Sequence, residues 1–329
     1  MKLLIVTQTV DTEDPVLGFF VRWIEEFAKH VECVAVICLM EGKHDSLPKN
    51  VRVHSLGKEK NPPRFARRLL YAIRFKMLAW RLRHDYDAVF VHMNPEYIVV
   101  AGPLWRLLGK RVALWYTHKN VDAKLRIAEK LVNIIFTASK ESFRLPSKKV
   151  HIMGHGIDTD FFSTDSSVVR GTAALSAGRL SPTKRNDLII RAAEHFPNEL
   201  RIVGDGPEQD RLERIAKELS IEHRVHFLGP KNQKGLRDEY CKAGVFVHAS
   251  ETGSLDKVVL EALACGLPVV TTAVALADLP VQVVDATPMA IAEGVIANRQ
   301  ANSVSLAAYV REHHSIGRLI PAILQLLVA

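Results

Sequence analysis

The chain has few cysteines, and they form no pattern. Among 329 residues only Cys33, Cys38, Cys241 and Cys265 occur, with no CxxC pair and no His/Cys cluster. Structural zinc sites need such clusters, and small secreted domains need dense disulfides. We therefore expect reduced, mostly buried thiols and no structural metal.

Long apolar runs are lacking as well. The opening MKLLIVTQTV has four apolar residues before Thr7, too few for a signal-peptide core, and is better interpreted as a first buried strand. No run approaches the roughly 18 apolar residues that a spanning helix needs. These absences predict a cytoplasmic protein, and the apolar stretch 316–329 is expected to pack on the protein as a helix.

Basic residues outnumber acidic ones in the first half only. Residues 1–160 contain 26 Lys and Arg against 17 Asp and Glu, whereas the remainder contains 18 against 19. Hydrophobic residues make up 48% and charged residues 24%, values typical of a soluble globular protein. The length fits two domains of about 150 residues each.

Much of the positive excess lies in residues 58–84. Apolar side chains recur there at helical spacing, namely Phe65, Leu69, Ile73, Met77 and Trp80. Arginines are interleaved with them, namely Arg64, Arg67, Arg68, Arg74 and Arg81. An amphipathic helix on the outside of a sheet is expected, with Phe65, Met77 and Trp80 partly buried and the arginines outward. Its outer face is either a solvated surface or an attachment to an anionic membrane through residues 64–83; no recognition motif for nucleic acid accompanies it.

Short apolar runs alternate with helical stretches along the whole chain, which predicts parallel sheets covered by helices. Strands are expected at residues 2–8, 33–39, 87–93, 111–117 and 133–139, and again at 173–178, 199–204, 224–229, 244–250 and 267–272. The fold class is α/β, with two tandem Rossmann-like domains. Their expected bounds are 1–158 and 172–310, with a linker over 159–171 and a C-terminal helix over 311–329.

Three loops of the second half follow predicted strands, where open α/β sheets bind ligands. GRLSPTKRND places Arg179 and Lys184 before a helix, and two cations so spaced suit a polyanion. GDGPEQ offers Gly204 for close backbone approach. SETGSLDKVVLEALACG starts a helix whose first N–H groups, those of Ser254 and Leu255, suit an anion.

Each of these loops also has a plainer interpretation. Arg179 and Lys184 could be solvated surface cations. GDGP lacks the third glycine of a dinucleotide fingerprint and could be only a tight turn. Glu261 could simply pair with Lys257 one turn earlier.

The chain resembles retaining glycosyltransferases of the GT-B fold, family 4, also called glycosyl transferases group 1. GRLSPTK, RIVGDGPEQDRL, VHFLGP and LEALACGLPVV carry the resemblance in the second half, and WYTHKN, FTAS and GHGIDTDFF carry it in the first half and the linker. It implies two domains facing each other across a cleft. It also implies a UDP- or GDP-sugar donor as co-substrate, with no other cofactor and no metal.

The resemblance also implies residue roles in the second half. Arg179 and Lys184 would hold the diphosphate, the backbone of Ser254 and Leu255 would add phosphate contacts, and Glu261 would bind the ribose. The backbone near Pro230 and Lys231 would meet the base.

One family residue is missing. The family has a glutamate eight residues before the one at Glu261, and here that position is Gly253. Glu251 or Asp256 is left to supply a carboxylate to the donor sugar, and we favour Glu251.

In the first half, the resemblance implies that His118 faces the donor sugar and the acceptor. A structural histidine in a strand-to-helix loop is the alternative. Near the start, Gly18 is all that remains of the family's double glycine. His92 and Asn94, after another strand, are further acceptor-contact candidates.

The expected activity is transfer of a sugar from a nucleotide-diphosphate sugar to an acceptor hydroxyl with retention, in the synthesis of a cell-surface polysaccharide or glycolipid. The acceptor is a saccharide or a lipid-linked saccharide, and the protein is cytoplasmic or peripheral on the inner face of the plasma membrane. Two alternatives remain: a sugar-nucleotide epimerase of the same fold, and a non-catalytic nucleotide-sugar-binding protein.

Overall fold

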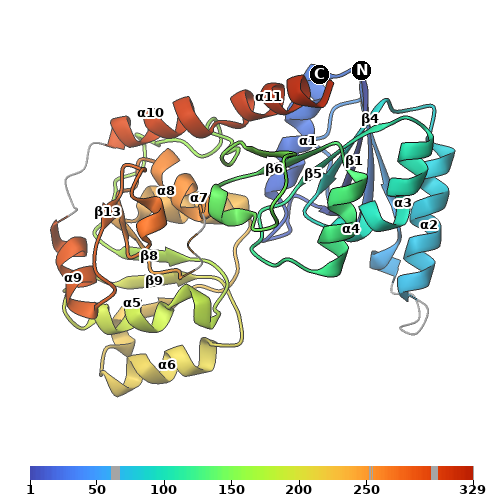
Figure 1. Cartoon of the computed structure of the whole chain (residues 1–329). Coiled ribbons are helices and arrows are strands. Elements are labelled where there is room, and N and C mark those ends of the chain that lie inside the picture. Colours follow the sequence, from blue (N-terminus) through green and yellow to red (C-terminus); the bar gives the residue numbers. More distant parts are fainter. Residues whose placement is uncertain (61–66, 252, 254, 298–302, 329) are drawn as a thin grey trace. The chain divides into compact units, whose positions relative to one another are not determined.

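The chain forms two compact units (Figure 1). Unit 1 is Met1–Gly156 with Ile316–Ala329, and unit 2 is Ile157–Ser315. The computed structural model describes residues 1–60, 67–251, 253, 255–297 and 303–328. Residues 159–171, where the sequence predicts a linker, pack on unit 2: Phe162 is buried, and the Arg170 guanidinium donates to the carbonyls of Tyr240, Ala243 and Cys265.

Unit 1 contains a seven-stranded parallel sheet in the order β3-β2-β1-β4-β5-β6-β7. The strands are β1 (Lys2–Val10), β2 (Cys33–Glu41), β3 (Val51–Ser55), β4 (Ala88–His92), β5 (Arg111–Trp115), β6 (Ile134–Thr137) and β7 (Val150–Ile152). The helices are α1 (Phe19–His30), α2 (Arg67–Arg81), α3 (Pro95–Leu107), α4 (Ala123–Leu131) and α11 (Ile316–Val328), with short 3₁₀ turns at Lys58–Lys60 and Lys140–Ser142.

Alternation along β1 explains the two layers of unit 1. Leu3 and Ile5 point into a core with α1 and α11, whereas Leu4 and Val6 point into a core with α2, α3 and α4. The apolar face of α11 is fully part of the first core, where Ile320 is completely buried. The last helix therefore packs on the protein, as the sequence predicts.

Unit 2 contains a six-stranded parallel sheet in the order β10-β9-β8-β11-β12-β13. The strands are β8 (Ala174–Ala177), β9 (Leu200–Val203), β10 (Val225–Phe227), β11 (Val245–His248), β12 (Val269–Thr271) and β13 (Gln282–Val283). The helices are α5 (Asn186–Ala193), α6 (Gln209–Glu218), α7 (Gln233–Lys242), α8 (Lys257–Ala264), α9 (Pro288–Ala297) and α10 (Ser303–His314), with 3₁₀ turns at Pro182–Lys184, Glu222–Arg224 and Val274–Leu276.

The predicted fold class is confirmed, since both units are parallel sheets covered by helices. All ten strands expected from the sequence are present. Three further strands, β3, β7 and β13, were missed, and each forms an edge of its sheet. Edge strands pack on one neighbour only, and these three are short and mostly half-buried, so they lack the continuous apolar run of a central strand.

Helix α2 is oriented differently from the expectation. Its apolar side chains at helical spacing point outward, with exposed fractions of 68% for Leu69, 50% for Ile73, 62% for Met77 and 49% for Trp80. We call these four residues the α2 stripe. The sheet is covered instead by Phe75 and Ala79 on the opposite face. The prediction that Met77 and Trp80 bury against the sheet is therefore wrong, and Arg64 and Phe65 lie outside the described residues.

Arg74 is also turned inward, against the expectation that it faces outward. Its guanidinium donates to the carbonyl of Leu56 at 2.9 Å. This bond and the burial of Phe75 fix the rotation of α2, and the α2 stripe is left outside because the sequence offers two apolar faces of which only one can contact the sheet.

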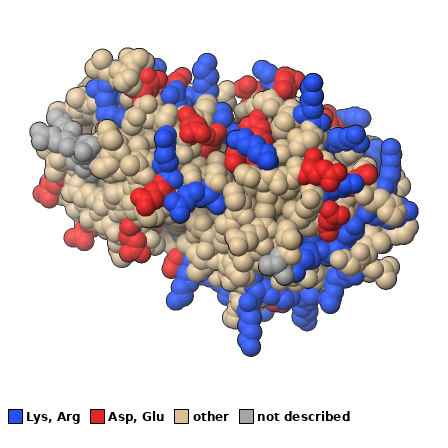
Figure 2. Space-filling view, turned by 90° about the horizontal axis from the view of Figure 1, so that it is seen from above, with Lys and Arg blue, Asp and Glu red and all other residues tan. Residues whose placement is uncertain are grey.

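Positive charge is concentrated in unit 1. Over the whole sequence, unit 1 has 27 Lys and Arg against 15 Asp and Glu, and unit 2 has 17 against 21. Figure 2 shows one face of the molecule, with blue Lys and Arg side chains frequent on the right-hand side, which unit 1 forms. In the described parts of the chain, no helix is long and apolar enough to cross a membrane.

Candidate nucleotide-sugar site

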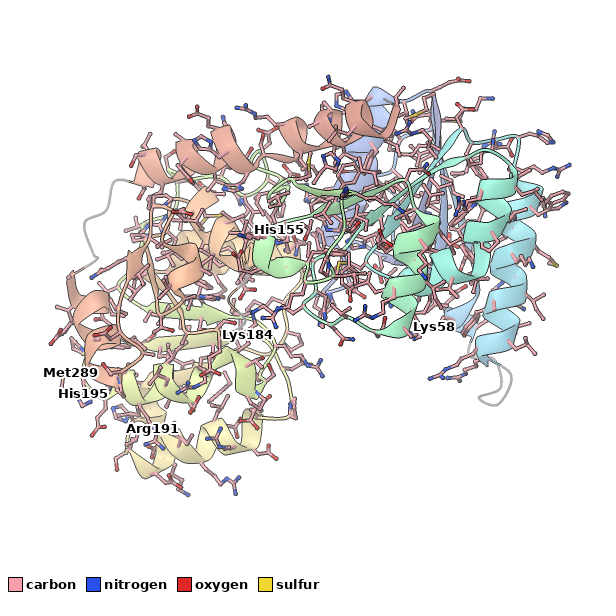
Figure 3. The ribbon with its side chains drawn as sticks, in the orientation of Figure 1. Lys58, His155, Lys184, Arg191, His195 and Met289 are labelled. Atoms are coloured by element: carbon pink, nitrogen blue, oxygen red, sulfur yellow. The ribbon has the colours of Figure 1, made fainter. Side chains whose placement is uncertain are left out.

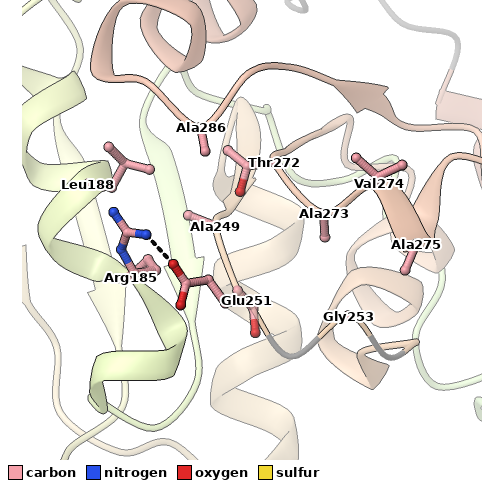
Figure 4. A pocket seen from close by; sticks show the side chains of 11 residues that line it. Arg185, Leu188, Ala249, Glu251, Gly253, Thr272, Ala273, Val274, Ala275 and Ala286 are labelled. Atoms are coloured by element: carbon pink, nitrogen blue, oxygen red, sulfur yellow. Dashed lines mark hydrogen bonds and ion pairs between the residues drawn. The ribbon is translucent and has the colours of Figure 1, made fainter. Parts of the chain in front are cut away.

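Two loops of unit 2 are joined by a pair of ion pairs. They follow β8 and β11, which are neighbours in the parallel sheet, so their carboxyl ends meet at one edge. Lys184, labelled in Figure 3, has its Nζ 2.7 Å from Asp256 Oδ2. The Arg185 guanidinium pairs with the Glu251 carboxylate (Figure 4). The Glu251 N–H also donates to the Thr183 carbonyl at 3.0 Å. The predicted cation Lys184 and both candidate carboxylates thus come together.

Asp256 is held from a second side by a histidine. His248 ends β11, and its Nε2 lies 2.8 Å from Asp256 Oδ2 while its Nδ1 lies 3.0 Å from Thr271 Oγ1. Burial raises the pKa of Asp256, but the His248 hydrogen bond and the Lys184 charge outweigh it, so the pKa lies well below its ordinary value. Asp256 is therefore a carboxylate already committed to two partners.

Glu251 has a more open position. Its side chain is 59% exposed and, with Arg185, lines a cavity of about 330 Å³ whose far wall is formed by Thr272, Ala273 and Val274 (Figure 4). The Arg185 backbone is in the left-handed region at φ 51°, a conformation that costs a non-glycine residue about 1 kcal/mol or more. Such strain is common in loops whose side chains are positioned for function.

The glycines of GDGP allow the two loops after β8 and β9 to touch. A Cβ at Gly204 would lie 2.0 Å from the Gly178 carbonyl oxygen, and one at Gly206 would lie 2.3 Å from that of Leu180. The Leu180 N–H donates to the Asp205 carbonyl at 2.7 Å across the same junction. The close approach that Gly204 permits is thus to the neighbouring loop, the loop that also carries the exposed Arg179.

Glu261 is buried on α8, with 1% exposure. Its carboxylate is paired with the Lys257 ammonium and accepts from the Tyr240 hydroxyl at 3.4 Å. The local pairing with Lys257 is therefore present, and a ribose bound at Glu261 would have to share the carboxylate with that lysine.

The remaining donor candidates lie at the same sheet edge or close to it. Pro230 follows β10 and is exposed, and Lys231 Nζ lies 3.4 Å from Glu239 Oε1. Leu255 is half-buried and packs on the core of unit 2. Ser254 lies outside the described residues.

In unit 1, the acceptor-side candidates surround the carboxyl ends of β1 and β4. Asn94 caps α3, and its Oδ1 accepts from Gln8 Nε2 at 2.9 Å. Gly18 precedes α1, and a Cβ there would lie 2.6 Å from the Asp14 carbonyl oxygen, so only glycine fits that turn.

His92 is placed inside the core. It is 2% exposed, stacks on Phe20 with ring centroids 3.9 Å apart, and lies 3.3 Å from the Thr7 hydroxyl. Burial lowers its pKa to about 3, with a small contribution from His155, so the ring is neutral. A ring this buried acts on a ligand only through its neighbours, which corrects the expectation of a direct acceptor contact.

His118 lies exposed in the loop after β5. Its Nδ1 accepts from the Asn120 N–H at 3.1 Å, so a neutral ring carries its proton on Nε2. Nε2–H is then the group that can donate to a ligand.

Two residues of the site were not predicted, and each has only a weak signal in the sequence. Arg185 follows Lys184 directly, and His248 lies within the predicted strand 244–250. Neither type of position is informative without the partner across the loop. Within the described part of the chain, no group of three or more His, Cys, Asp or Glu side chains is placed to hold a metal ion.

Known proteins match this architecture. Residues 166–312 match the family model described as Glycosyl transferases group 1. A D-inositol 3-phosphate glycosyltransferase of Mycolicibacterium smegmatis is 32% identical over 172 residues, which is 48% of this chain and 39% of that protein. The enzyme of the same name from Mycobacteroides abscessus is 35% identical over 152 residues, 42% of this chain and 34% of that protein. The chain thus spans well under half the length of these curated relatives.

Solved structures match the whole chain. HepE of Anabaena, in complex with UDP and glucose, gives a TM-score of 0.77 at 18% identity and covers 100% of both chains. Sucrose-phosphate synthase of Thermosynechococcus elongatus gives a TM-score of 0.77 at 16% identity, covering 99% of this chain and 98% of that one.

The tandem parallel sheets and these structures define a protein of the GT-B fold. Within it, residues 166–312 match the Glycosyl transferases group 1 model, which agrees with the resemblance drawn from the second half of the sequence.

Proposed function

We propose that this protein is a glycosyltransferase that moves a sugar from a nucleotide-diphosphate sugar to an acceptor hydroxyl with retention of configuration. The observation that carries the proposal is the gathering of Arg179, Lys184 and the start of α8 at one sheet edge, inside the region that matches the family. The UDP bound in the HepE structures supports a UDP- or GDP-sugar as donor.

In this proposal the donor diphosphate lies against Arg179, Lys184 and the first turn of α8. The bond between the anomeric carbon and the phosphate oxygen breaks, and the negative charge that develops on the leaving diphosphate is stabilised by those groups. They supply the charge that a metal ion supplies in other enzymes. The acceptor oxygen bonds to the anomeric carbon on the same face, and its proton passes to an oxygen of the departing phosphate.

Glu251 is the carboxylate that we propose for the donor sugar. Asp256 is engaged by Lys184 and His248, whereas the Glu251 side chain is mostly exposed and pairs with Arg185. An exposed pair of this kind contributes about 0–1 kcal/mol, so a sugar hydroxyl can compete for Glu251 at low cost.

The remaining roles follow the family resemblance. We propose that Glu261 accepts from the ribose, that the backbone near Pro230, Lys231, Ser254 and Leu255 contacts the base and phosphates, and that Gly204 keeps the loop carrying Arg179 in place. On the acceptor side we propose His118 as a hydrogen-bond donor through Nε2, with Asn94 and the turn at Gly18 beside it.

We further propose that unit 1 attaches reversibly to an anionic membrane surface, where the acceptor is a glycolipid precursor or another lipid-linked saccharide. Helix α2 has five basic residues and no acidic one. It also exposes the α2 stripe, so an outward apolar face is bordered by positive charge, as in helices that lie in a membrane interface.

Thermal unfolding with UDP, GDP, ADP and their sugars tests the donor. A nucleotide present at 100 times its dissociation constant stabilises by about 2.7 kcal/mol. A preferred donor incubated alone and with acceptors then separates an epimerase from a transferase, and NMR of the product reports its anomeric configuration. No stabilisation by any nucleotide diphosphate would refute the donor site.

A further inference from the structure

A second cavity lies in unit 1, at the carboxyl ends of β1 and β2. Its volume is about 460 Å³, which is within the usual size range of sites for small organic ligands. It is enclosed by α2 and α3, and Asn94, the acceptor-side candidate, forms part of its wall together with Gln8. We call it the unit 1 cavity.

The inner wall of this cavity is apolar. It is formed by Leu39, Leu56, Ala72, Phe75 and Val100. Such a wall offers no hydrogen bonds to the hydroxyls of a saccharide. Burying a hydroxyl without a hydrogen-bond partner costs about 2 kcal/mol or more, as it does for an amide. An apolar chain or ring, in contrast, is stabilised by the same wall.

Among the polar lining residues, Gln8 and Asn94 bond to each other at 2.9 Å, and the Tyr97 hydroxyl donates to the Thr7 carbonyl. Arg68 and Lys124 line the rim, and Lys124 is paired with Glu96 at 2.6 Å, so the rim has two cations and one carboxylate. Deeper, the Tyr71 hydroxyl is buried and has no hydrogen-bond partner among the described residues. A buried hydroxyl without a partner is uncommon, and a ligand oxygen in the cavity would satisfy it.

We propose that the unit 1 cavity binds a phosphorylated lipid, with the apolar chain against Leu39, Leu56 and Phe75 and the phosphate between Arg68 and Lys124. The inference rests on the proposed function and narrows it, because it places the lipid chain and the phosphate of a lipid-linked saccharide acceptor in this cavity. Helix α2 borders both the unit 1 cavity and the proposed membrane-contacting surface. Tyr71, Ala72 and Phe75 line the cavity, while Leu69 and Ile73 of the same turns belong to the exposed α2 stripe. A molecule dissolved in a bilayer can therefore enter beside the surface that we propose contacts the bilayer.

The test measures binding of farnesyl phosphate to the full chain by calorimetry, at concentrations below the aggregation threshold of the probe. Farnesyl phosphate should bind, and the affinity for farnesol should be lower by about tenfold or more. Inositol 3-phosphate and inorganic phosphate should not bind detectably. Equal binding of inositol 3-phosphate and farnesyl phosphate would overturn the lipid assignment, because it would show a site that reads only the phosphate.

Variants locate the bound probe. Ala72→Phe fills the cavity and should abolish binding, and the double variant Arg68→Gln/Lys124→Gln should weaken it about tenfold or more, since charge-assisted contacts are lost. The double variant Lys49→Gln/Lys76→Gln changes the same charge elsewhere in unit 1 and should have no effect. Ile73→Ser, which alters only the α2 stripe, should also leave binding unchanged. If Ile73→Ser lost binding while Ala72→Phe kept it, the probe would lie on the surface and the inference would be overturned.

Two controls keep the outcomes separate. Thermal unfolding shows whether Ala72→Phe is folded. If it is not, the Arg68→Gln/Lys124→Gln variant alone tests whether the probe binds in the cavity. UDP binding is measured on the same samples. UDP binding and sugar transfer without farnesyl phosphate binding would refute the cavity assignment and leave the proposed function intact, whereas farnesyl phosphate binding without any nucleotide binding would refute the function and leave the cavity assignment intact.

Discussion

The Lys184 ammonium and the Asp256 carboxylate lie 2.7 Å apart, and they link two loops that are 72 residues apart in sequence. His248 holds the same carboxylate oxygen from the core side. The cation proposed for the donor diphosphate is therefore positioned in advance, but it is also partly neutralised. A bound diphosphate has to share Lys184 with Asp256.

Replacing Asp256 by Asn should strengthen nucleotide binding. The substitution removes a negative charge next to the proposed diphosphate, and we expect UDP affinity to rise several-fold, an effect on the order of 1 kcal/mol for partly screened charges. Calorimetry with UDP measures it. Weaker binding would show instead that Asp256 is needed to place Lys184.

The same variant should alter the acid stability of the protein. The pKa of Asp256 is lowered in the folded state, so its contribution is complete above its unfolded pKa of about 3.9 and is lost as the pH falls below that value. The unfolding free energy of the wild type should thus decrease more steeply below about pH 4 than that of Asp256→Asn. Denaturant titrations from pH 7 to pH 2.5 give both curves, and parallel curves would contradict the prediction.

Arg179→Ala and Lys184→Ala should separate binding from stability. Each should weaken UDP binding about tenfold or more, because each deletes a charge-assisted contact. Only Lys184→Ala should lower the melting temperature, since it leaves Asp256 with one partner fewer, whereas Arg179 is exposed. Lys217→Ala, an exposed cation on α6, serves as the control and should change neither quantity.

The two glutamates should behave differently. Glu261→Gln should weaken UDP binding and destabilise unit 2, because a buried carboxylate is lost and its partner Lys257 loses its counter-charge. Glu251→Gln should lower turnover while leaving UDP affinity and the melting temperature nearly unchanged, since its pair with Arg185 is exposed. Normal turnover by Glu251→Gln would remove it as the sugar-binding carboxylate.

The α2 stripe should be required for membrane attachment. We expect the protein to sediment with vesicles containing anionic lipid and not with neutral vesicles, and attachment should fade as salt rises, because charges are screened over about 8 Å at physiological ionic strength. Ile73→Ser/Met77→Ser should reduce attachment severalfold. Leu107→Ser, which alters an 83% exposed leucine on α3, is the matched control and should bind as the wild type does. Equal binding to both kinds of vesicle would contradict the electrostatic part.

The sequence by itself determined the central strands of both sheets and the family resemblance. The central strands are continuous apolar runs between turn residues, and loops after strands gather at one edge of any parallel sheet, so Arg179, Lys184 and the start of α8 were predictable neighbours. LEALACGLPVV gave the resemblance because it combines a helix with the turn that follows it. These features are local or follow from parallel topology alone.

Only the tertiary structure decided how side chains are paired and which faces are covered. Nothing along the chain shows that Asp256 bonds to Lys184 and His248 while Glu251 bonds to Arg185, because each choice depends on loops brought together across the sheet. The burial of His92 beneath Phe20 likewise depends on a helix that precedes it by about 70 residues. Helix α2 has two apolar faces, and periodicity cannot tell which one meets the sheet; the packing of Phe75 and Ala79 settled it, and left the α2 stripe exposed.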